Sequence, residues 1–259
     1  MTETPTDTLE DYPDLVPTEE CPRWLREEPL AHRGLHVPDG VPENSLAAFA
    51  AAAAAGYGVE LDVTLSRDRV PVLSHDPTLE RAAGRPERIA DLTVAELAAV
   101  SLEGTREHIP TLAAALAVLR EVPVMVELKQ PSLRVGLLES AVAHLLDAHP
   151  GPWCVAGFNP ASLRWFRRHR PDAIRALTAG PINGARLPRM VRRRLAELRD
   201  LPGVAPHAVS YDLDGLPNPP CDAWRSRGGV LVTWTATDQA SLRRARGLAD
   251  NVIFEHVTP

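Results

Sequence analysis

The sequence predicts an α/β barrel, and three observations lead to this fold class. The chain has 259 residues, close to the roughly 250 that are typical of a (β/α)8 barrel. Strand-like and helix-like segments alternate along it, as expected for a parallel sheet built from βαβ units. Nine segments read as extended, but 58–66 and 69–75 are separated only by Arg67-Asp68. They can pair only as an antiparallel hairpin, because parallel neighbours need a long crossover. With the hairpin counted as one barrel strand plus a return arm, eight strands remain and predict a TIM (β/α)8 barrel.

The expected elements of the first half are bounded by clear start and stop residues. The Ala-rich helix over 45–56 has Asn44 or Ser45 as its cap and Gly56 at its end. The helix over 133–149 stops at Pro150-Gly151. The remaining expected elements are the strands 29–33, 58–66, 69–75 and 122–129 and the helices 92–100 and 111–120. The stretch 76–121 is therefore expected to form an enlarged loop with two small helices, following the hairpin arm.

In the second half, proline again marks the ends of helices. The helix over 161–170 ends before Pro171, and the Arg-rich helix over 185–200 ends before Pro202-Gly203. The other expected elements are the strands 153–158, 173–178, 208–213, 229–235 and 251–254 and the helices 222–227 and 239–248. The first strand is not followed by a Gly-x-Gly-x-x-Gly motif, so an open dinucleotide-binding sheet is not supported.

Charge divides the chain into a leader and a body. Residues 1–20 hold seven acids and no Lys or Arg, and the rest of the chain holds 27 acids and 28 bases. We expect residues 1–22 to form a flexible acidic leader and 23–259 to form the barrel. The nearly neutral body gives no reason to expect a nucleic-acid partner, and the arginines of 185–200 fit a solvated helix face.

The sequence also bears on location. No apolar run approaches the roughly 20 residues that span a bilayer, so no stable membrane insertion is expected. The acidic N-terminus lacks the basic and apolar regions of a secretory signal. Three widely spaced cysteines, Cys21, Cys154 and Cys221, fit a reducing compartment better than a disulfide framework. We therefore expect a cytoplasmic protein, and the sequence leaves its oligomeric state open.

Acidic residues gather on one face of the predicted hairpin. If Arg67-Asp68 is a two-residue turn, Glu60 lies opposite His75, and Asp62, two residues on, shares the same face. Glu127 ends the next barrel strand. Surface charge or salt bridging would explain a single such pair, but acids on neighbouring strands favour a hard divalent cation, either Mg²⁺ or Ca²⁺.

Basic side chains accompany these acids. Lys129 is the only lysine in a chain with 28 Lys and Arg residues, which indicates a position that needs a compact ammonium group. His32 and Arg33 follow the first strand and precede Gly34, which permits a tight turn. Arg33 can bind a phosphate through two hydrogen bonds. Two histidines and a metal suit phosphoryl chemistry, in which one imidazole accepts a proton from the nucleophile and the other protonates the leaving alkoxide.

The order of these motifs resembles that of the glycerophosphodiester phosphodiesterase family. The motifs are His32-Arg33-Gly34, Pro42-Glu43-Asn44-Ser45, Glu60-Leu61-Asp62-Val63, His75-Asp76-Pro77, Ile109-Pro110-Thr111-Leu112, Glu127-Leu128-Lys129, Phe158-Asn159-Pro160 and Trp234-Thr235. The resemblance covers roughly 29–256. It implies a TIM barrel that hydrolyses glycerophosphodiesters to sn-glycerol 3-phosphate and an alcohol.

The resemblance also implies roles for individual residues. His32 and His75 match the acid/base pair, and the matching metal ligands are Glu60, Asp62 and Glu127. Arg33 and Lys129 match the bases that contact phosphate. Glu43 lies beside the site and either ligates the metal or orients His32, and Trp234 matches an aromatic pocket wall, with a place in the barrel core as the alternative.

The chain departs from the family pattern in several places. Asp68-Arg69 stands where Asp-Gly is usual, Gly157 replaces a serine, Ala236-Thr237 replaces Val-Asn, and Phe254-Glu255 replaces Thr-Asp. The catalytic and metal positions are intact, so the departures concern substrate choice.

Two alternatives stay open. One is a lysophospholipase D-like phosphodiesterase, which needs an apolar channel at the barrel mouth; the polar stretch 84–88 disfavours it. The other is a non-catalytic barrel that binds phosphodiesters.

Overall fold

The computed structural model describes residues 17, 19–181 and 188–259. Its strands are β1 Leu30–His32, β2 Gly58–Leu65, β3 Pro71–Leu73, β4 Val124–Leu128, β5 Trp153–Gly157, β6 Arg175–Ala179, β7 Ala208–Asp212, β8 Val230–Ala236 and β9 Asn251–Phe254. Its α-helices are α1 Arg23–Glu27, α2 Leu46–Ala54, α3 Glu80–Ala83, α4 Val94–Leu97, α5 Leu112–Val118, α6 Leu137–Asp147, α7 Pro160–His169, α8 Arg189–Ala196, α9 Leu201–Val204, α10 Pro219–Ser226 and α11 Gln239–Leu248. Two 3₁₀ turns, η2 Ile89–Asp91 and η3 Leu213–Gly215, complete the described elements.

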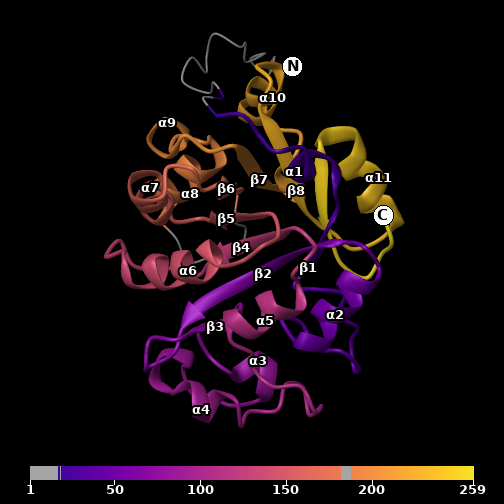
Figure 1. Ribbon diagram of the computed structural model, residues 1–259. Coiled ribbons are helices and arrows are strands. Elements are labelled where there is room, and N and C mark those ends of the chain that lie inside the picture. The colour runs from indigo at the N-terminus through magenta and orange to yellow at the C-terminus, as the bar shows by residue number, and fades with distance from the viewer. Residues whose placement is uncertain (1–16, 18, 182–187) are drawn as a thin grey trace.

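Eight parallel strands close into a barrel. β1 pairs with both β2 and β9, and the ring continues through β4, β5, β6, β7 and β8. Among the described strands, β3 pairs with β2 alone, and it runs antiparallel to it. The helices lie around the ring (Figure 1). The predicted TIM barrel with a hairpin arm is confirmed.

The predicted register of the hairpin is wrong by one residue. Val63 pairs with Leu73 and Leu65 with Pro71, and the Ser66 amide donates to the Val70 carbonyl at 3.0 Å. Three residues therefore connect the strands, and Arg69 adopts a left-handed conformation with φ 63°. Three-residue hairpin loops commonly end in such a residue. Glu60 is consequently not opposed to His75.

The stretch 76–121 holds more structure than predicted. α3, η2 and α4 precede α5, and the first two are too short to show a helical period in the sequence. Their side chains share a small core with β3 and the loop before α5, formed by Val72, Leu79, Ile89, Leu97, Val100, Leu102 and Ile109. In Figure 1 these elements gather around the far end of β2 and β3. The stretch is therefore a packed extension of the arm.

Two predicted regions fall partly outside the described residues. The acidic leader over 1–22 is described only at 17 and 19–22, and the division into leader and barrel stays a prediction. The helix expected over 185–200 is described from 188, and its helical part is Arg189–Ala196. Among the described residues, no helix combines the length and apolar character needed to cross a membrane.

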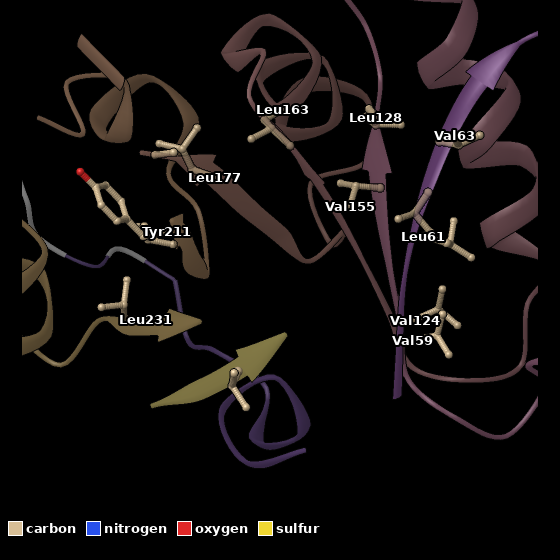
Figure 2. Close-up of a cluster of buried hydrophobic side chains, with 14 of the residues drawn as sticks. Val59, Leu61, Val63, Val124, Leu128, Val155, Leu163, Leu177, Tyr211 and Leu231 are labelled. Atoms are coloured by element: carbon tan, nitrogen blue, oxygen red, sulfur yellow. The ribbon is translucent and has the colours of Figure 1, made fainter. Parts of the chain in front are cut away.

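Alternating residues of the strands face two different apolar layers. One set packs outward against the helices, and Figure 2 shows part of it, with Val59, Leu61 and Val63 on β2 and Leu163 on α7. The other set fills the barrel interior with Leu30, Met125, Cys154, Ala156, Ala176, Ala208, Val230, Val232 and Ile253, against Leu25 of α1. Apolar packing thus occupies the lower interior, and polar side chains are left at the carboxyl ends of the strands.

Candidate active site

Three carboxylates meet at the carboxyl ends of β2 and β4. Asp62 pairs with Glu127 across the two strands, and Glu60 pairs with Met125, so all three acids point into the barrel. Glu60 and Asp62 are only 3% and 1% exposed. Oxygen atoms of the three carboxylates lie within 4.8 Å of one another. The structure therefore brings the three predicted metal-ligating residues together.

Two basic side chains partly balance this charge. Lys129 Nζ lies 2.6 Å from Glu127 Oε1 and 2.8 Å from Asp62 Oδ1. Arg33 Nε lies 3.0 Å from Asp62 Oδ2, a close ion pair whose geometry is not that of a hydrogen bond. The lone lysine and the arginine after β1 thus both face the carboxylates.

Asn44 is a site residue that the sequence interpretation missed. Its Nδ2 donates to Asp62 Oδ2 at 2.9 Å, and its Oδ1 accepts from the Asp62 amide at 3.2 Å. The sequence interpretation considered it only as a helix cap, but Ser45 caps α2 by accepting from the Ala48 amide. Its place in the motif Pro42-Glu43-Asn44-Ser45 is the signal that could have identified it.

The carboxylates differ in how well they are compensated. Burial alone would raise the pKa of Asp62, but Lys129 and Arg33 hold it well below its usual range. Burial, together with the charges of Asp62 and Glu127, raises the pKa of Glu60 well above its usual range. Glu60 Oε2 is buried, and no group of the described residues forms a hydrogen bond with it. A divalent cation fits this donor set, since it would supply the missing partner and relieve the repulsion.

Two histidines flank the cluster, and a carboxylate holds each of them. His32 is the last residue of β1, and its Nδ1 lies 2.7 Å from Glu255 Oε2. His75 follows β3, and its Nδ1 lies 2.7 Å from Asp76 Oδ1. When Nδ1 bonds to a carboxylate, Nε2 is the nitrogen left to exchange a proton. His32 Nε2 is 3.9 Å from Glu60 Oε2.

The surroundings of the two rings differ. The side chain of His32 is 16% exposed and that of His75 is 36% exposed. Burial and the positive charge of Lys129 lower the pKa of His75 below its usual value. Glu255 was noted in the sequence only as a departure from a pattern. Its role beside His32 arises because β9 and β1 are neighbours in the closed barrel.

Glu43 occupies a different position from either predicted one. It accepts from Arg33 Nη1 at 2.8 Å and from Arg81 Nη2 at 2.7 Å. Arg81 Nε in turn lies 2.6 Å from Asp76 Oδ2. Burial would raise the pKa of Glu43, but the two arginines lower it. Glu43 therefore acts on the site through Arg33 and connects it to the carboxylate that holds His75.

These groups surround a cavity of about 350 Å³ at the barrel mouth. Its lining includes eight of the nine predicted site residues, namely His32, Arg33, Glu60, Asp62, His75, Glu127, Lys129 and Trp234. Trp234 meets Phe158 edge-to-face with ring centroids 5.8 Å apart, so it forms part of the wall. The register that predicted the position of His75 is wrong, but His75 lies beside the carboxylates because the chain turns after β3.

A second, more apolar groove of about 460 Å³ adjoins this cavity. The two share His75, Glu127, Lys129 and Phe158. The apolar side chains that line the groove are Leu65, Pro77, Ile89, Ala90, Leu128, Pro131, Leu138 and Phe158. The groove therefore opens on the His75 side of the cavity, between the arm and the start of α6.

The comparisons with known proteins agree on one family. A model of the glycerophosphoryl diester phosphodiesterase family matches residues 32–257. Glycerophosphodiester phosphodiesterase 1 of Bos taurus is 38% identical over 101 residues, which cover 36% of this chain and 30% of that protein. A lysophospholipase D of Rattus norvegicus is 30% identical over 131 residues, covering 46% of this chain and 41% of that protein.

A solved structure with the same fold comes from Oleispira antarctica, a phosphodiesterase in complex with the product sn-glycerol-3-phosphate. Its TM-score is 0.74 at 24% identity, over 88% of this chain and 92% of that one. The chain spans less than a third of the length of the mammalian glycerophosphodiester phosphodiesterases 1 that it matches.

Proposed function

The chain belongs to the glycerophosphoryl diester phosphodiesterase family, and we propose that it hydrolyses glycerophosphodiesters to sn-glycerol 3-phosphate and an alcohol. One observation carries the proposal: three carboxylates, two carboxylate-held histidines, an arginine and a lysine all line a single cavity. A phosphodiester presents anionic oxygens and an alkoxide leaving group, and this set provides a partner for each.

Each residue has a defined part in the proposed reaction. Glu60, Asp62 and Glu127 hold a divalent cation, Mg²⁺ or Ca²⁺, which when bound neutralises charge on the phosphate oxygens. Arg33 and Lys129 bind the same oxygens. One histidine accepts the proton of the attacking hydroxyl, whether of water or of the substrate's glycerol, as the new P–O bond forms. The other histidine donates its proton to the alcohol oxygen as the old P–O bond breaks.

The position of the groove supports an assignment of the two histidines. The groove is lined by His75 but not by His32. An alcohol that leaves through it departs past His75. We therefore assign proton donation to His75 and proton abstraction to His32.

A leaving-group series tests this assignment. A proton donor matters less when the leaving alcohol is acidic, so His75→Ala should recover activity on bis-p-nitrophenyl phosphate relative to glycerophosphocholine. His32→Ala should be impaired on both substrates. The reverse pattern contradicts the assignment, and undiminished turnover in either variant removes that residue from the acid/base pair.

Metal depletion tests the proposal as a whole. We expect release of choline from glycerophosphocholine to vanish in EDTA and to return when Mg²⁺ or Ca²⁺ is added. As a control, Asp212→Asn should respond to EDTA and to added metal as wild type does. Asp212 also ends a barrel strand but does not line the cavity. Full turnover after depletion contradicts a metal mechanism, and the absence of turnover with every metal favours the non-catalytic barrel.

A second candidate, lysophospholipase D activity, is favoured by the apolar groove. The sequence disfavoured this activity because the stretch 84–88 is polar, but the groove has an apolar lining, and a relative carries that name. In this case the groove holds the glycerol and its acyl chain instead of the leaving alcohol, and the roles assigned to His75 and His32 are exchanged. Ala90→Asp places a charge at an exposed position of the groove. A selective loss of choline release from lysophosphatidylcholine, with glycerophosphocholine unaffected, supports the second activity.

All three cysteines are free thiols, which fits the reducing compartment expected from the sequence, and the cytoplasmic location stays a prediction.

A further inference from the structure

A second group of metal-ligating side chains lies just outside the cavity. His36 follows β1, and Glu255 and His256 follow β9. The two segments meet because Ala31 of β1 pairs with Phe254 of β9. None of the three side chains lines the cavity, and none belongs to the carboxylate cluster. The group therefore adjoins the cavity without lining it, and its member Glu255 contacts His32.

The geometry of the group already approaches that of a metal site. One ligand atom of each residue lies within 4.8 Å of the other two. His36 Nε2 is 3.4 Å from Glu255 Oε2, and the rings of His36 and His256 meet with centroids 4.7 Å apart. In a tetrahedral zinc site with bonds of 2.0–2.1 Å, neighbouring ligand atoms are about 3.3 Å apart. Small side-chain rotations thus suffice to bring the three atoms around one ion.

The access of the group from solvent suits such an ion. The Glu255 side chain is 21% exposed and that of His36 is 12% exposed, while His256 is on the surface. An ion can therefore enter from solvent and retain a water ligand in the fourth position.

We propose that His36, Glu255 and His256 bind a transition-metal ion of the Zn²⁺ class, at a site distinct from the carboxylate cluster. Two imidazoles and one carboxylate favour Zn²⁺, Co²⁺, Ni²⁺ or Cu²⁺ over Mg²⁺ and Ca²⁺, which take oxygen ligands. The same chain thus carries two metal sites of opposite chemical preference. His32 lies between them, since it contacts Glu255 through Nδ1 and faces Glu60 through Nε2.

Binding at this site has a consequence for hydrolysis. Glu255 Oε2 lies 2.7 Å from His32 Nδ1 and 3.4 Å from His36 Nε2. An ion on Glu255 competes with His32 for the carboxylate and loosens the orientation of its ring. We therefore expect Zn²⁺ to inhibit the enzyme. This consequence rests on the function proposed above, whereas metal binding itself does not.

Cobalt absorption provides the direct test. The untagged full chain is saturated with Mg²⁺ to fill the carboxylate cluster and then titrated with Co²⁺, whose visible spectrum distinguishes four-coordinate nitrogen-containing sites from six-coordinate oxygen sites. We expect one equivalent of four-coordinate Co²⁺, displaced by Zn²⁺. His256→Ala and His36→Gln should each weaken binding at least about tenfold, since even a residue that only supports a metal ligand is worth 10–100-fold in affinity.

His169→Ala is the control, because it removes an exposed histidine of α7, outside this group. His256 is exposed, and circular dichroism checks that its variant keeps the fold of the wild type. The absence of a four-coordinate cobalt signal, or equal affinity in wild type and His256→Ala, overturns the site. Zn²⁺ that binds by this assay and leaves hydrolysis unchanged overturns the coupling to His32 alone.

Discussion

Buried charged side chains occur at both ends of the barrel, and the two ends differ in the partners that these side chains have. At the carboxyl ends of the strands, Glu60 is 3% exposed, and one of its oxygens has no hydrogen-bond partner in the part of the chain that the structure describes. At the amino end, Arg175 begins β6 and is 1% exposed. Its Nη1 donates to the carbonyls of Pro171 and Ala173 at 3.1 and 2.7 Å, and its Nη2 donates to that of Ala205 at 3.0 Å.

The difference concerns the kind of partner each charge has. Arg175 ties backbone segments on either side of β6 to one another, and its Nη2 also lies 3.5 Å from Glu19 Oε1, while its Nε has no hydrogen-bond partner among the described residues. The backbone partners are fixed parts of the chain. Glu60 faces other charges and a cavity, so its missing partner is exchangeable. Buried charge satisfied by backbone is structural, and buried charge left facing a cavity is available for binding and catalysis. Four substitutions test this contrast.

The largest effect is expected at Glu60. Glu60→Gln removes a proposed metal ligand, and we expect kcat/KM on glycerophosphocholine to fall about 10³-fold or more, equivalent to ~4 kcal/mol. Its stability should not fall. A raised carboxyl pKa in the folded state costs stability as pH rises above the ordinary value, and this variant removes that cost.

Kinetics and urea unfolding in EDTA at pH 5 and pH 7.5 check both expectations. The metal-free wild type should lose stability between these pH values relative to Glu60→Gln. A variant that unfolds more easily than wild type at both pH values assigns Glu60 a structural role and breaks the contrast.

Arg175→Met should behave in the opposite way. It leaves the buried carbonyls of Ala173 and Ala205 and the partly buried carbonyl of Pro171 without their donor. At about 1 kcal/mol or more for each buried group, we expect a loss of roughly 3 kcal/mol in the free energy of unfolding. The kcat/KM of the folded fraction should match wild type, because Arg175 lies at the other end of the barrel. Arg168→Met, an exposed arginine on α7, is the control. An equal unfolding midpoint in both variants contradicts the structural role.

Glu255→Gln should have an intermediate effect on activity. The amide retains an oxygen near His32 but loses the charge of the carboxylate. We expect kcat to fall about 10- to 100-fold, the usual cost of removing a group that orients a reacting side chain, with KM unchanged. Glu255→Asp should restore part of kcat. A rise in KM at constant kcat instead places Glu255 in substrate binding.

The two ends also differ in how far the sequence predicts them. The carboxyl-end residues were predictable because each follows a recognisable strand, and parallel strands end at the same rim of a barrel. Asn44 and Glu255 were not identified as site residues, since their contacts depend on neighbours in space; Glu255 is 223 positions from His32.

Local conformation limited the remaining predictions. The hairpin register depends on Arg69 adopting a φ of 63°. A glycine at this position would have indicated such a conformation, whereas an arginine does not. The short α3 and η2 carry too few residues for a period to appear. Arg175 was not singled out in the sequence, because an arginine at the start of a strand shows its role only when the carbonyls around it are known.

The smallest effect at neutral pH is expected at His207, which precedes β7 at the amino end. It is 7% exposed, and its Nδ1 accepts from the Arg175 amide at 3.1 Å. Burial and the Arg175 charge lower its pKa to about 4, below the unperturbed value of roughly 6.5. Between about pH 4 and roughly 6.5, His207 is therefore protonated in the unfolded chain but not in the folded chain. The contribution of His207 to the free energy of unfolding should be fully present above pH 6.5 and should be lost as the pH decreases toward 4.

His207→Asn keeps an acceptor for the Arg175 amide and cannot be protonated. Its unfolding free energy should vary less than that of wild type between pH 6.5 and 4, with kcat/KM at pH 7.5 unchanged. His169→Asn, on the surface, should retain the pH dependence of wild type. Identical acid profiles for wild type and His207→Asn contradict the low pKa. A loss of activity in His207→Asn at pH 7.5 breaks the separation between the structural and the catalytic end of the barrel.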